Sequence, residues 1–321
     1  MRIVRDTLFI APENRGSAAA IGNFDGVHLG HQAIIALARS EAARLGVPSG
    51  VMTFEPHPRQ FFAPEAPAFR LMNAAARAHR LEKMGVDVLY EVPFNAGLAA
   101  LSAEEFARVV IAERLGLAHV VVGEDFRFGK GRTGDAEALR VFGERFGFGV
   151  TVSGLIEIGE GLGDQIGQGE VSSTAIRRAL SEGRPRDAAA MLGHWHRIEG
   201  PVIRGDQRGR ELGYPTANMS IAGLHPPRFG VYAVKVDVLE GPFAGSYDGA
   251  ASIGVRPMFG ENLPNCETFL FGFKGDLYGT ALSVALVHYL RPEMKFDGLD
   301  ALISQMGADC DRARAILADV D

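Results

Sequence analysis

Two histidines near the N-terminus are the first side chains whose spacing could support chemistry. His28 and His31 belong to the stretch Ile21-Gly22-Asn23-Phe24-Asp25-Gly26-Val27-His28-Leu29-Gly30-His31, between a predicted strand and a predicted helix. Three residues apart, both imidazoles lie on one side of the helix start and can donate hydrogen bonds to phosphate oxygens. A helix N-terminus after glycines also favours phosphate, because free N–H groups and the positive dipole end meet there. We expect a polyphosphate site; the alternative is a glycine-rich turn with two incidental histidines.

Two later segments carry groups suited to the same anion. His57 lies in Thr53-Phe54-Glu55-Pro56-His57-Pro58, at the end of a predicted strand, where the sites of α/β proteins gather. Ser172, Thr174 and Arg177 open a predicted helix, and their hydroxyl and guanidinium groups suit anionic oxygen. Taken alone, the first segment is a stiff loop, and Ser172 is a helix cap.

A third loop, Gly123–Arg132, is rich in glycine, arginine and phenylalanine. Its residues Asp125, Phe126 and Arg127 could wrap a planar aromatic ligand that carries phosphate, through stacking and charge. A solvated basic loop is the alternative.

The C-terminal half has a phosphate-suited stretch of its own, Gly205–Asn218. Backbone N–H groups around Gly209 can cradle phosphate, and the oxygens of Thr216 and Asn218 are hard ligands that suit magnesium. Glu267 opens a strand-like apolar segment, where a carboxylate could act as a general base. An ordinary turn and a surface glutamate are the respective alternatives.

The elements that position these groups change character along the chain. Strands are predicted at 18–21, 50–54, 86–92, 119–122 and 150–152, with helices between them, which indicates βαβ units and a parallel sheet. Ser102 and Glu105 form a predicted capping box ahead of a helix that carries Phe106, Val109, Val110 and Leu115 on one face.

After two short predicted helices within 176–192, short strands separated by turns follow. Residues 232–238 alternate with period two. The segments 267–273 and 282–290 flank a Lys274-Gly275-Asp276 turn and predict a hairpin. One amphipathic helix with Leu299, Leu302, Ile303, Met306 and Ile316 ends the chain. We expect an antiparallel β domain, a barrel, closed by a helix.

Composition narrows the class of protein and its partners. Of 321 residues, 47% are hydrophobic and 22% charged, which suits two globular domains. A net charge of −6 gives no reason to expect nucleic acid as a partner. Cys266 and Cys310 are the only cysteines and form no metal motif, which suits a reducing compartment. The absence of a signal peptide or a long apolar run predicts a soluble cytoplasmic protein with no membrane partner.

The N-terminal segments, in this order, resemble the FMN adenylyltransferase module of bacterial bifunctional riboflavin kinase/FMN adenylyltransferases, or FAD synthetases. The motifs are G-N-F-D-G-V-H-L-G-H, T-F-x-P-H-P, D-F-R-F-G-x-x-R-x-G-D and S-S-T-x-I-R. The resemblance implies a Rossmann-like nucleotidyltransferase domain that uses magnesium. It assigns catalysis to His28 and His31, ATP and its phosphates to Gly22, Asn23, Gly30, His57, Ser172, Thr174 and Arg177, and flavin to Asp125, Phe126 and Arg127.

The C-terminal half resembles the riboflavin kinase module of the same family. The motifs are G-R-E-L-G-Y-P-T-A-N, G-V-Y-A-V, I-G-V-R-P, D-L-Y-G and L-R-P-E-M-K-F. The resemblance implies a six-stranded barrel with a terminal helix, in which Thr216 and Asn218 coordinate magnesium and ATP, and Gly209 lies at the phosphates. It makes Glu267 the base that activates the ribityl 5′-hydroxyl of riboflavin.

Three residues depart from the usual kinase pattern. Met258 stands where the family has Thr, Phe269 where it commonly has His, and Gly272 where it has Asp. Each change removes a hydrogen-bonding group near the expected flavin or base.

The resemblance implies that residues 1–184 form FAD from FMN and ATP, and that residues 185–321 form FMN from riboflavin and ATP. The cofactor is Mg²⁺, the partners are these small molecules, and homo-oligomerisation is left open. Three alternatives remain: a monofunctional adenylyltransferase whose barrel only binds flavin, a flavin carrier without activity, and a nucleotidyltransferase with another acceptor. The departures at Met258, Phe269 and Gly272 motivate the first.

Overall fold

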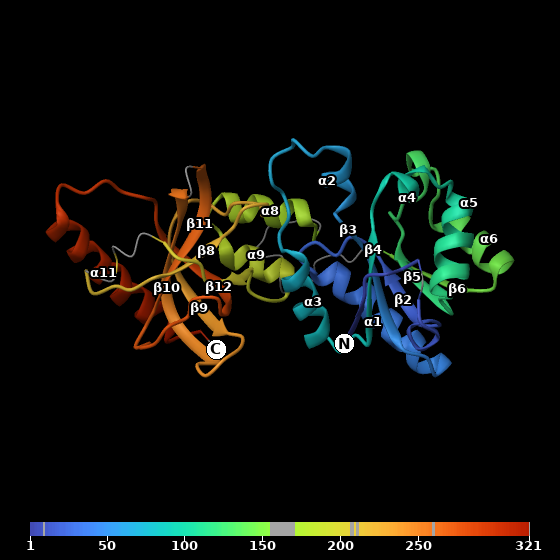
Figure 1. Cartoon of the computed structure of the whole chain (residues 1–321), viewed down its shortest axis with the longest axis horizontal. Coiled ribbons are helices and arrows are strands. Elements are labelled where there is room, and N and C mark those ends of the chain that lie inside the picture. The colour runs from blue at the N-terminus through green and yellow to red at the C-terminus, as the bar shows by residue number, and fades with distance from the viewer. Residues whose placement is uncertain (9, 155–170, 206–208, 210–211, 259–260, 321) are drawn as a thin grey trace. The chain divides into compact units, whose positions relative to one another are not determined.

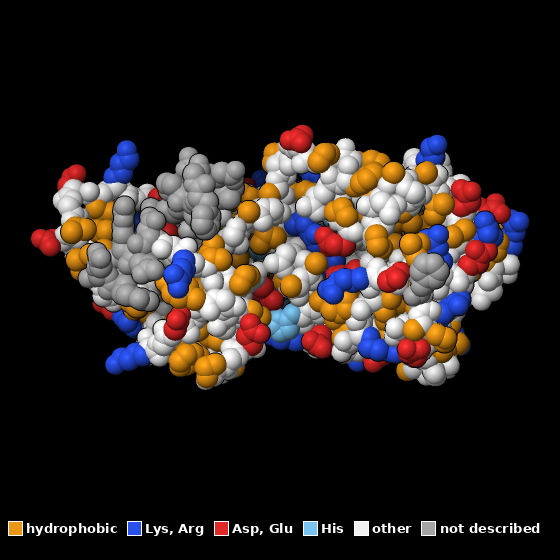
Figure 2. Space-filling model, viewed as in Figure 1, with side chains coloured by type: hydrophobic (Ala, Val, Ile, Leu, Met, Phe, Trp, Pro, Cys, Tyr) orange, Lys and Arg blue, Asp and Glu red, His pale blue; other side chains and the backbone are white. Residues whose placement is uncertain are grey.

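The computed structural model describes residues 1–8, 10–154, 171–205, 209, 212–258 and 261–320, the side chains of 256–258 and 261–263 excepted. The chain divides into two compact units, Met1–Ala66 with Arg77–Ile158, and Pro67–Ala76 with Gly159–Asp321. On the face drawn in Figure 2, basic and acidic side chains are interspersed. Of the helices in the described ranges, none is both long and apolar enough to cross a membrane.

The first unit is built on a six-stranded parallel sheet with the order β1-β4-β3-β2-β5-β6 (Figure 1). The strands are β1 (Arg2–Val4), β2 (Ala18–Ile21), β3 (Ser49–Glu55), β4 (Val88–Pro93), β5 (His119–Gly123) and β6 (Gly149–Ser153). The helices are η1 (Pro12–Asn14), α1 (Leu29–Leu45), α2 (Pro58–Phe62), α3 (Ala74–Lys83), α4 (Ala96–Ala100), α5 (Ala103–Glu105), η2 (Phe106–Leu115), η3 (Lys130–Arg132) and α6 (Ala136–Phe146). The predicted parallel α/β architecture is confirmed, and the short edge strand β1 is an addition to it.

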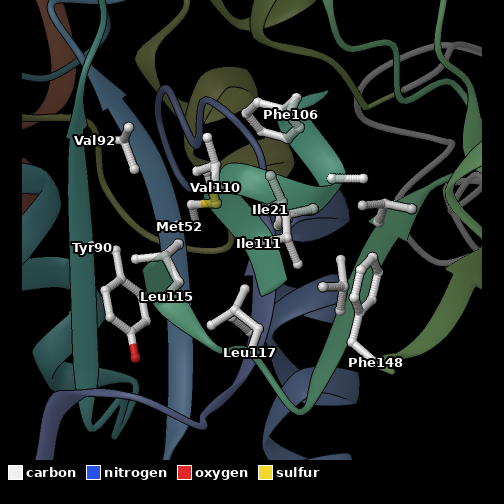
Figure 3. Close-up of a cluster of buried hydrophobic side chains, with 14 of the residues drawn as sticks. Ile21, Met52, Tyr90, Val92, Phe106, Val110, Ile111, Leu115, Leu117 and Phe148 are labelled. Atoms are coloured by element: carbon white, nitrogen blue, oxygen red, sulfur yellow. The ribbon is translucent and has the colours of Figure 1, made fainter. Parts of the chain in front are cut away.

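The two faces of this sheet are covered separately because successive strand residues point to opposite sides. On one face, Ile21, Met52 and Tyr90 pack with Val110 and Ile111 of η2, as Figure 3 shows. On the other face α1 packs on β2, β3 and β5, with its buried Ile35 and Ala38 toward the sheet. Small residues in β2, Ala18–Ile21, allow this close packing on both sides.

The predicted capping box is confirmed, but the helix after it is wound differently from the expectation. The hydroxyl of Ser102 accepts from the N–H of Glu105, and the Glu105 carboxylate accepts from the N–H of Ser102. Beyond this cap, η2 is a π-helix. Its wider turn buries Ala107 and Ile111 together with Phe106, Val110 and Leu115, whereas Val109, predicted on the buried face from 3.6-residue spacing, is only half-buried.

The second unit is built on six antiparallel strands with the order β7-β12-β9-β10-β11-β8. The strands are β7 (Arg197–Pro201), β8 (Ala217–Ser220), β9 (Gly230–Val238), β10 (Gly245–Met258), β11 (Glu261–Leu270) and β12 (Ala281–Arg291); the helices are α8 (Ser173–Ser181), α9 (Pro185–Leu192) and α11 (Leu299–Leu317). Just after β7, Ile203 pairs with Asn218 of β8, and its N–H donates to the Asn218 carbonyl at 2.8 Å. The sheet therefore nearly closes on itself, as predicted for a barrel.

The predicted hairpin of 267–273 with 282–290 is wrong. β11 pairs with β10 and β8, whereas β12 pairs with β9 and β7, so the two strands are not neighbours. β10 and β11 pair from Gly249↔Leu270 to Met258↔Glu261, which leaves β11 one free edge, and β8 takes it. β12 is buried from Leu282 to Val287, and this apolar run suits a strand with a neighbour on each side. The exposed Lys274-Gly275-Asp276 turn lies in the connection between them.

The terminal helix is confirmed, and its buried residues lie on the predicted side, where Ile316 packs against them. The buried residues of α11 are Asp309, Cys310, Ala313 and Leu317, and Leu299 is 63% exposed. Its N-terminal half instead places Leu302 and Met306 at a cavity, described below.

Candidate active sites

The candidate adenylyltransferase residues of the first unit meet at one edge of the parallel sheet. β2 lies between β3 and β5 in the sheet. The chain continues from β2 to β3 and β4 on one side, and later to β5 and β6 on the other, so the strand order reverses between β2 and β5. Ligands of open α/β sheets bind at such a switch point, beyond the carboxyl ends of the strands. His28, His57 and Asp125 follow the carboxyl ends of β2, β3 and β5, respectively.

The two histidines form a stacked pair at the start of α1. Their ring centroids lie 3.6 Å apart at an interplanar angle of 21°. The Phe24 and His31 rings meet edge to face, with their centroids 5.2 Å apart. A side chain at Gly30 would crowd the histidine pair, because its Cβ would lie 3.2 Å from the His28 ring. The turn before the helix is tight: Gly26 has a φ of 88°, and Phe24 and Val27 also adopt positive φ.

Hydrogen bonds fix the proton position on the neutral His28 ring. His28 is the N-cap of α1, and its Nδ1 accepts from the N–H of His31 at 3.4 Å. In a neutral ring the proton is then on Nε2, which can donate to an anion. Burial, and then His28, hold the pKa of His31 well below its usual range. The His31 ring is consequently neutral at pH 7.

His57 repeats this arrangement at the end of β3. It is the N-cap of α2, its Nδ1 accepts from the N–H of Arg59 at 3.0 Å, and its own N–H donates to Gln60 at 3.3 Å. Nε2 of the neutral His57 ring therefore carries the proton as well. The turn beside it is held by Thr53, whose hydroxyl donates to the carbonyl of Asn23 at 3.2 Å.

The loop after β5 presents the third group of predicted residues. Asp125 and Arg127 are exposed, and the Arg127 guanidinium lies 3.6 Å from the Asp135 carboxylate. Phe126 stacks on Phe128, with centroids 5.4 Å apart and an interplanar angle of 17°. Phe128 is buried in the core, so the loop offers only the half-buried ring of Phe126, with exposed cations such as Arg127 in the same loop.

Ser172, Thr174 and Arg177 belong to the second compact unit, so no distance joins them to the histidines. Ser172 is the N-cap of α8 and accepts from the N–H of Ala175 at 3.2 Å, as the simpler alternative supposed. Thr174 is exposed. Arg177 donates to the carbonyl of Phe69 at 2.6 Å, and its guanidinium lies over that ring at 5.4 Å.

The candidate kinase residues come together in one cavity of about 410 Å³ in the second unit. Gly209, Thr216, Asn218 and Glu267 all line it. The pairing of β8 with β11 sets Asn218 directly opposite Glu267. Neighbouring strands hold such partners about 5 Å apart, so the carboxylate and the amide face the same volume.

The donors present fit a magnesium ion that is held partly by nucleotide. Within the described residues, no cluster of three or more His, Cys, Asp and Glu side chains could hold a metal. Thr216 and Asn218 supply hydroxyl and amide oxygens, which are the hard ligands that Mg²⁺ prefers beside phosphate. A Cβ at Gly205 would come within 2.8 Å of the Asn218 amide, so this glycine keeps the amide's position open.

Two of the three departures from the family pattern can be placed. Phe269 lines the cavity and packs edge-on against Tyr214, with centroids 5.3 Å apart. Gly272 is exposed after β11 with a φ of 69°, a conformation that favours glycine. The side chain of Met258 lies outside the described residues.

Sequence reasoning missed several polar residues of the kinase cavity. Asn265 is 2% exposed, lines the cavity and donates to the Glu267 carboxylate at 3.3 Å. Its spacing of two from Glu267 on one strand was an available signal. Arg291 and Asp309 also line the cavity, from β12 and α11. No local motif pairs them, because a loop separates the two elements.

The two cysteines are poor candidates for nucleophiles. Both are buried and unpaired. Burial raises the pKa of Cys266 to about 12 and that of Cys310 to about 11, so both are thiols at neutral pH.

Comparison with known proteins assigns both halves of the chain to known families. The FAD synthetase family model matches residues 10–168, and the riboflavin kinase model matches 192–317. The predicted boundary at 184/185 falls between these matches and stays a prediction. A crystal structure from Streptococcus pneumoniae, described as a macrolide-efflux protein, superposes with a TM-score of 0.79 at 30% identity, covering 97% of this chain and 98% of that one.

Full-length relatives carry one name. A bifunctional riboflavin kinase/FMN adenylyltransferase of Pseudomonas fluorescens is 42% identical over 99% of this chain and 98% of its own length. One from Escherichia coli K12 is 36% identical over 96% of each chain. Both halves of the chain therefore match one family, and this chain belongs to the bifunctional riboflavin kinase/FMN adenylyltransferases.

Proposed function

We propose that this chain makes both flavin cofactors: it phosphorylates riboflavin to FMN with ATP, and then adenylylates FMN to FAD with release of pyrophosphate. The observation that carries the proposal is the kinase cavity, where Thr216, Asn218 and Glu267 meet although Asn218 and Glu267 are 49 positions apart in the sequence. A barrel retained only for binding flavin needs no carboxylate opposite an amide ligand. The monofunctional alternative is therefore disfavoured.

In the kinase reaction, Glu267 is the general base. It accepts the proton of the ribityl 5′-hydroxyl while that oxygen attacks the γ-phosphorus, and ADP leaves. Asn265 orients the carboxylate through its 3.3 Å hydrogen bond. Thr216 and Asn218 hold Mg²⁺ with the nucleotide, and the ion supplies neutralisation of phosphate charge. Gly205 and Gly209 let the backbone approach the phosphates.

In the adenylyltransferase reaction, the residues contribute position and charge rather than a nucleophile. The FMN phosphate attacks the α-phosphorus of ATP in line with the departing pyrophosphate. His28 and His31 donate hydrogen bonds to the oxygens on which negative charge grows, and His57 donates to the neighbouring phosphates. Gly22, Asn23 and Gly30 give the turn that admits the triphosphate. Ser172, Thr174 and Arg177 are assigned to nucleotide phosphates on the strength of the motif alone.

The flavin of this second reaction is assigned to the loop after β5. Phe126, backed by the buried Phe128 ring, offers an aromatic face for an isoalloxazine ring, and Arg127 and Asp125 offer polar contacts at its rim. Residues 1–184 and 185–321 are the proposed extents of the two activities. A cytoplasmic location, where ATP is available, and the absence of a nucleic-acid partner belong to the same proposal.

The test is a chromatographic time course of the purified chain with riboflavin, ATP and Mg²⁺ that resolves riboflavin, FMN and FAD. We expect FMN to rise first and FAD to follow it. If riboflavin persists while added FMN becomes FAD, the barrel is not a kinase. If neither conversion occurs and flavin only binds, the carrier alternative holds.

A further inference from the structure

A buried ion pair lies in the wall of the kinase cavity. Arg291, the last residue of β12, donates from Nε and Nη2 to both oxygens of Asp309, at distances of 2.7 to 3.0 Å. The two side chains are 15% and 9% exposed. Asp309 also accepts from Gln305 of α11 at 2.9 Å. Two parallel bonds of this kind fix orientation as well as distance.

The same guanidinium contacts the segment that connects β12 to α11. Its Nη1 donates to the carbonyl of Pro292 at 2.9 Å, and its Cζ lies 5.7 Å from the centre of the Phe296 ring. Arg291 therefore joins three pieces of structure: the end of β12, the segment 292–298 and the middle of α11.

These pieces supply the mainly apolar wall of the cavity. Met294 and Phe296 come from the segment, and Leu302, Met306 and Cys310 come from α11. The lining also has a polar part, which Thr216, Asn218, Asn265 and Glu267 form from β8, β11 and the residues before β8. A planar ring with a polar tail suits such a cavity, with the ring against the apolar wall and the hydroxyl near Glu267.

A buried ion pair seldom stabilises a fold more than apolar side chains of similar volume, because desolvation offsets the attraction. α11 also has an apolar anchorage of its own, through Cys310, Ala313 and Leu317. The ion pair is thus better explained by its fixing of the position of the apolar cavity wall than by a contribution to the stability of the fold.

We propose that Arg291 and Asp309 are positioning residues for riboflavin: their ion pair holds the segment 292–298 and α11 at the distance from β11 that the flavin ring requires. The inference rests on the proposed kinase function. It predicts that weakening the pair impairs the use of riboflavin and leaves the use of ATP and the adenylylation of FMN unchanged.

The experiment uses the full chain with Arg291→Lys, Asp309→Asn and the double variant. We expect each single variant to raise the KM for riboflavin at least tenfold, about 1.4 kcal/mol, with the KM for ATP within twofold. Because both changes break the same ion pair, the KM for riboflavin in the double variant should not exceed that of the more impaired single variant. Adenylylation of supplied FMN, measured in the same samples, is the internal control for folding. Asp311→Asn, which removes an exposed pair with Arg314 on the same helix, is the matched control.

The fluorescence emission of the only tryptophan in the sequence tests whether a raised KM for riboflavin is accompanied by movement of α11. Trp195 packs in the cluster that contains Ala313 and Leu317, so its emission reports the docking of α11. A raised KM for riboflavin supports the proposal, whether Trp195 is unchanged or shifted. A KM within twofold of the parent in both single variants overturns it. A parent chain that does not phosphorylate riboflavin contradicts the proposed function instead.

Discussion

The two units place their reactive groups in different ways. In the first unit, the candidate residues lie in short contiguous stretches that follow the carboxyl ends of β2, β3 and β5. In the second unit, the cavity draws on β8, β11, the end of β12 and α11, which are distant in sequence. Loops on a parallel sheet keep their chemistry in local motifs, whereas a barrel assembles its chemistry from side chains on different strands.

Removing the general base should give the largest effect and separate the two units most sharply. For Glu267→Gln we expect riboflavin phosphorylation to fall about 10²- to 10⁴-fold, because the amide cannot take the hydroxyl proton. FMN adenylylation should persist at the parent rate. Initial rates with each flavin check this, and Glu240→Gln, at an exposed glutamate after β9, is the control. Equal loss of both activities would mean that the units do not act separately.

The converse experiment removes one donor from the stacked histidine pair. For His28→Ala we expect FAD formation from FMN to fall about 10²- to 10³-fold, as for other donors to a charged transition state. The substitution also removes the cap of α1, so circular dichroism should accompany the kinetics. His79→Ala, a partly exposed histidine of α3, is the control. Unchanged FAD formation would restore the alternative of incidental histidines.

Acid should weaken the barrel through a buried histidine outside both sites. Burial first, and then His194 and His225, lower the pKa of His196 to about 3. Between that value and the ordinary 6.5, the unfolded chain binds a proton that the folded chain excludes, so the free energy of unfolding falls as the pH drops below 6.5. At pH 5 the loss is about 2 kcal/mol.

Urea unfolding at pH 5 and pH 8, followed by the emission of the adjacent Trp195, measures this loss. In His196→Gln the dependence on pH should shrink by the same amount. The same slope in both proteins would assign the acid sensitivity to other groups.

A smaller effect should follow from filling the space beside Asn218. In Gly205→Ala the new methyl group would lie 2.8 Å from the Asn218 amide and displace it. We expect about a tenfold loss of kcat/KM for ATP in the kinase reaction, about 1.4 kcal/mol. Gly200→Ala is the control, because its methyl group meets nothing within 4 Å. Equal rates in the two variants would remove Asn218 from the nucleotide site.

The difference between local motifs in the first unit and distant strands in the second also decides how much could be predicted from sequence. The parallel sheet, most of its helices and both histidines followed from periodicity and local motifs. The hairpin of β11 with β12 was wrong because pairing depends on which strand edges are already occupied, and no local pattern records that. The π-helix η2 was missed because its burial pattern differs from a 3.6-residue repeat only after packing is known.

Within the kinase cavity, Glu267 was predicted because it lies in a motif, and Asn265 was not, although it shares the strand face. Asp309 was passed over because a charge on an apolar helix face is ordinarily taken as exposed. Only the approach of Arg291 explains its burial, and that contact joins two elements across a loop. Residues whose partners are distant in sequence are therefore the ones that sequence reasoning overlooks.

The opposed positions of Asn218 and Glu267 have a consequence for folding fidelity. Slipping β8 along β11 by one residue would turn Asn218 to the other side of the sheet, and slipping it by two would move it about 7 Å from Glu267. A mispaired barrel could still bury much of its apolar surface and remain compact, but it would have no kinase activity. Kinase activity therefore reports only the molecules whose β8 and β11 are paired in the correct register. During refolding, the recovery of riboflavin phosphorylation measures correct folding more strictly than an optical signal of collapse does.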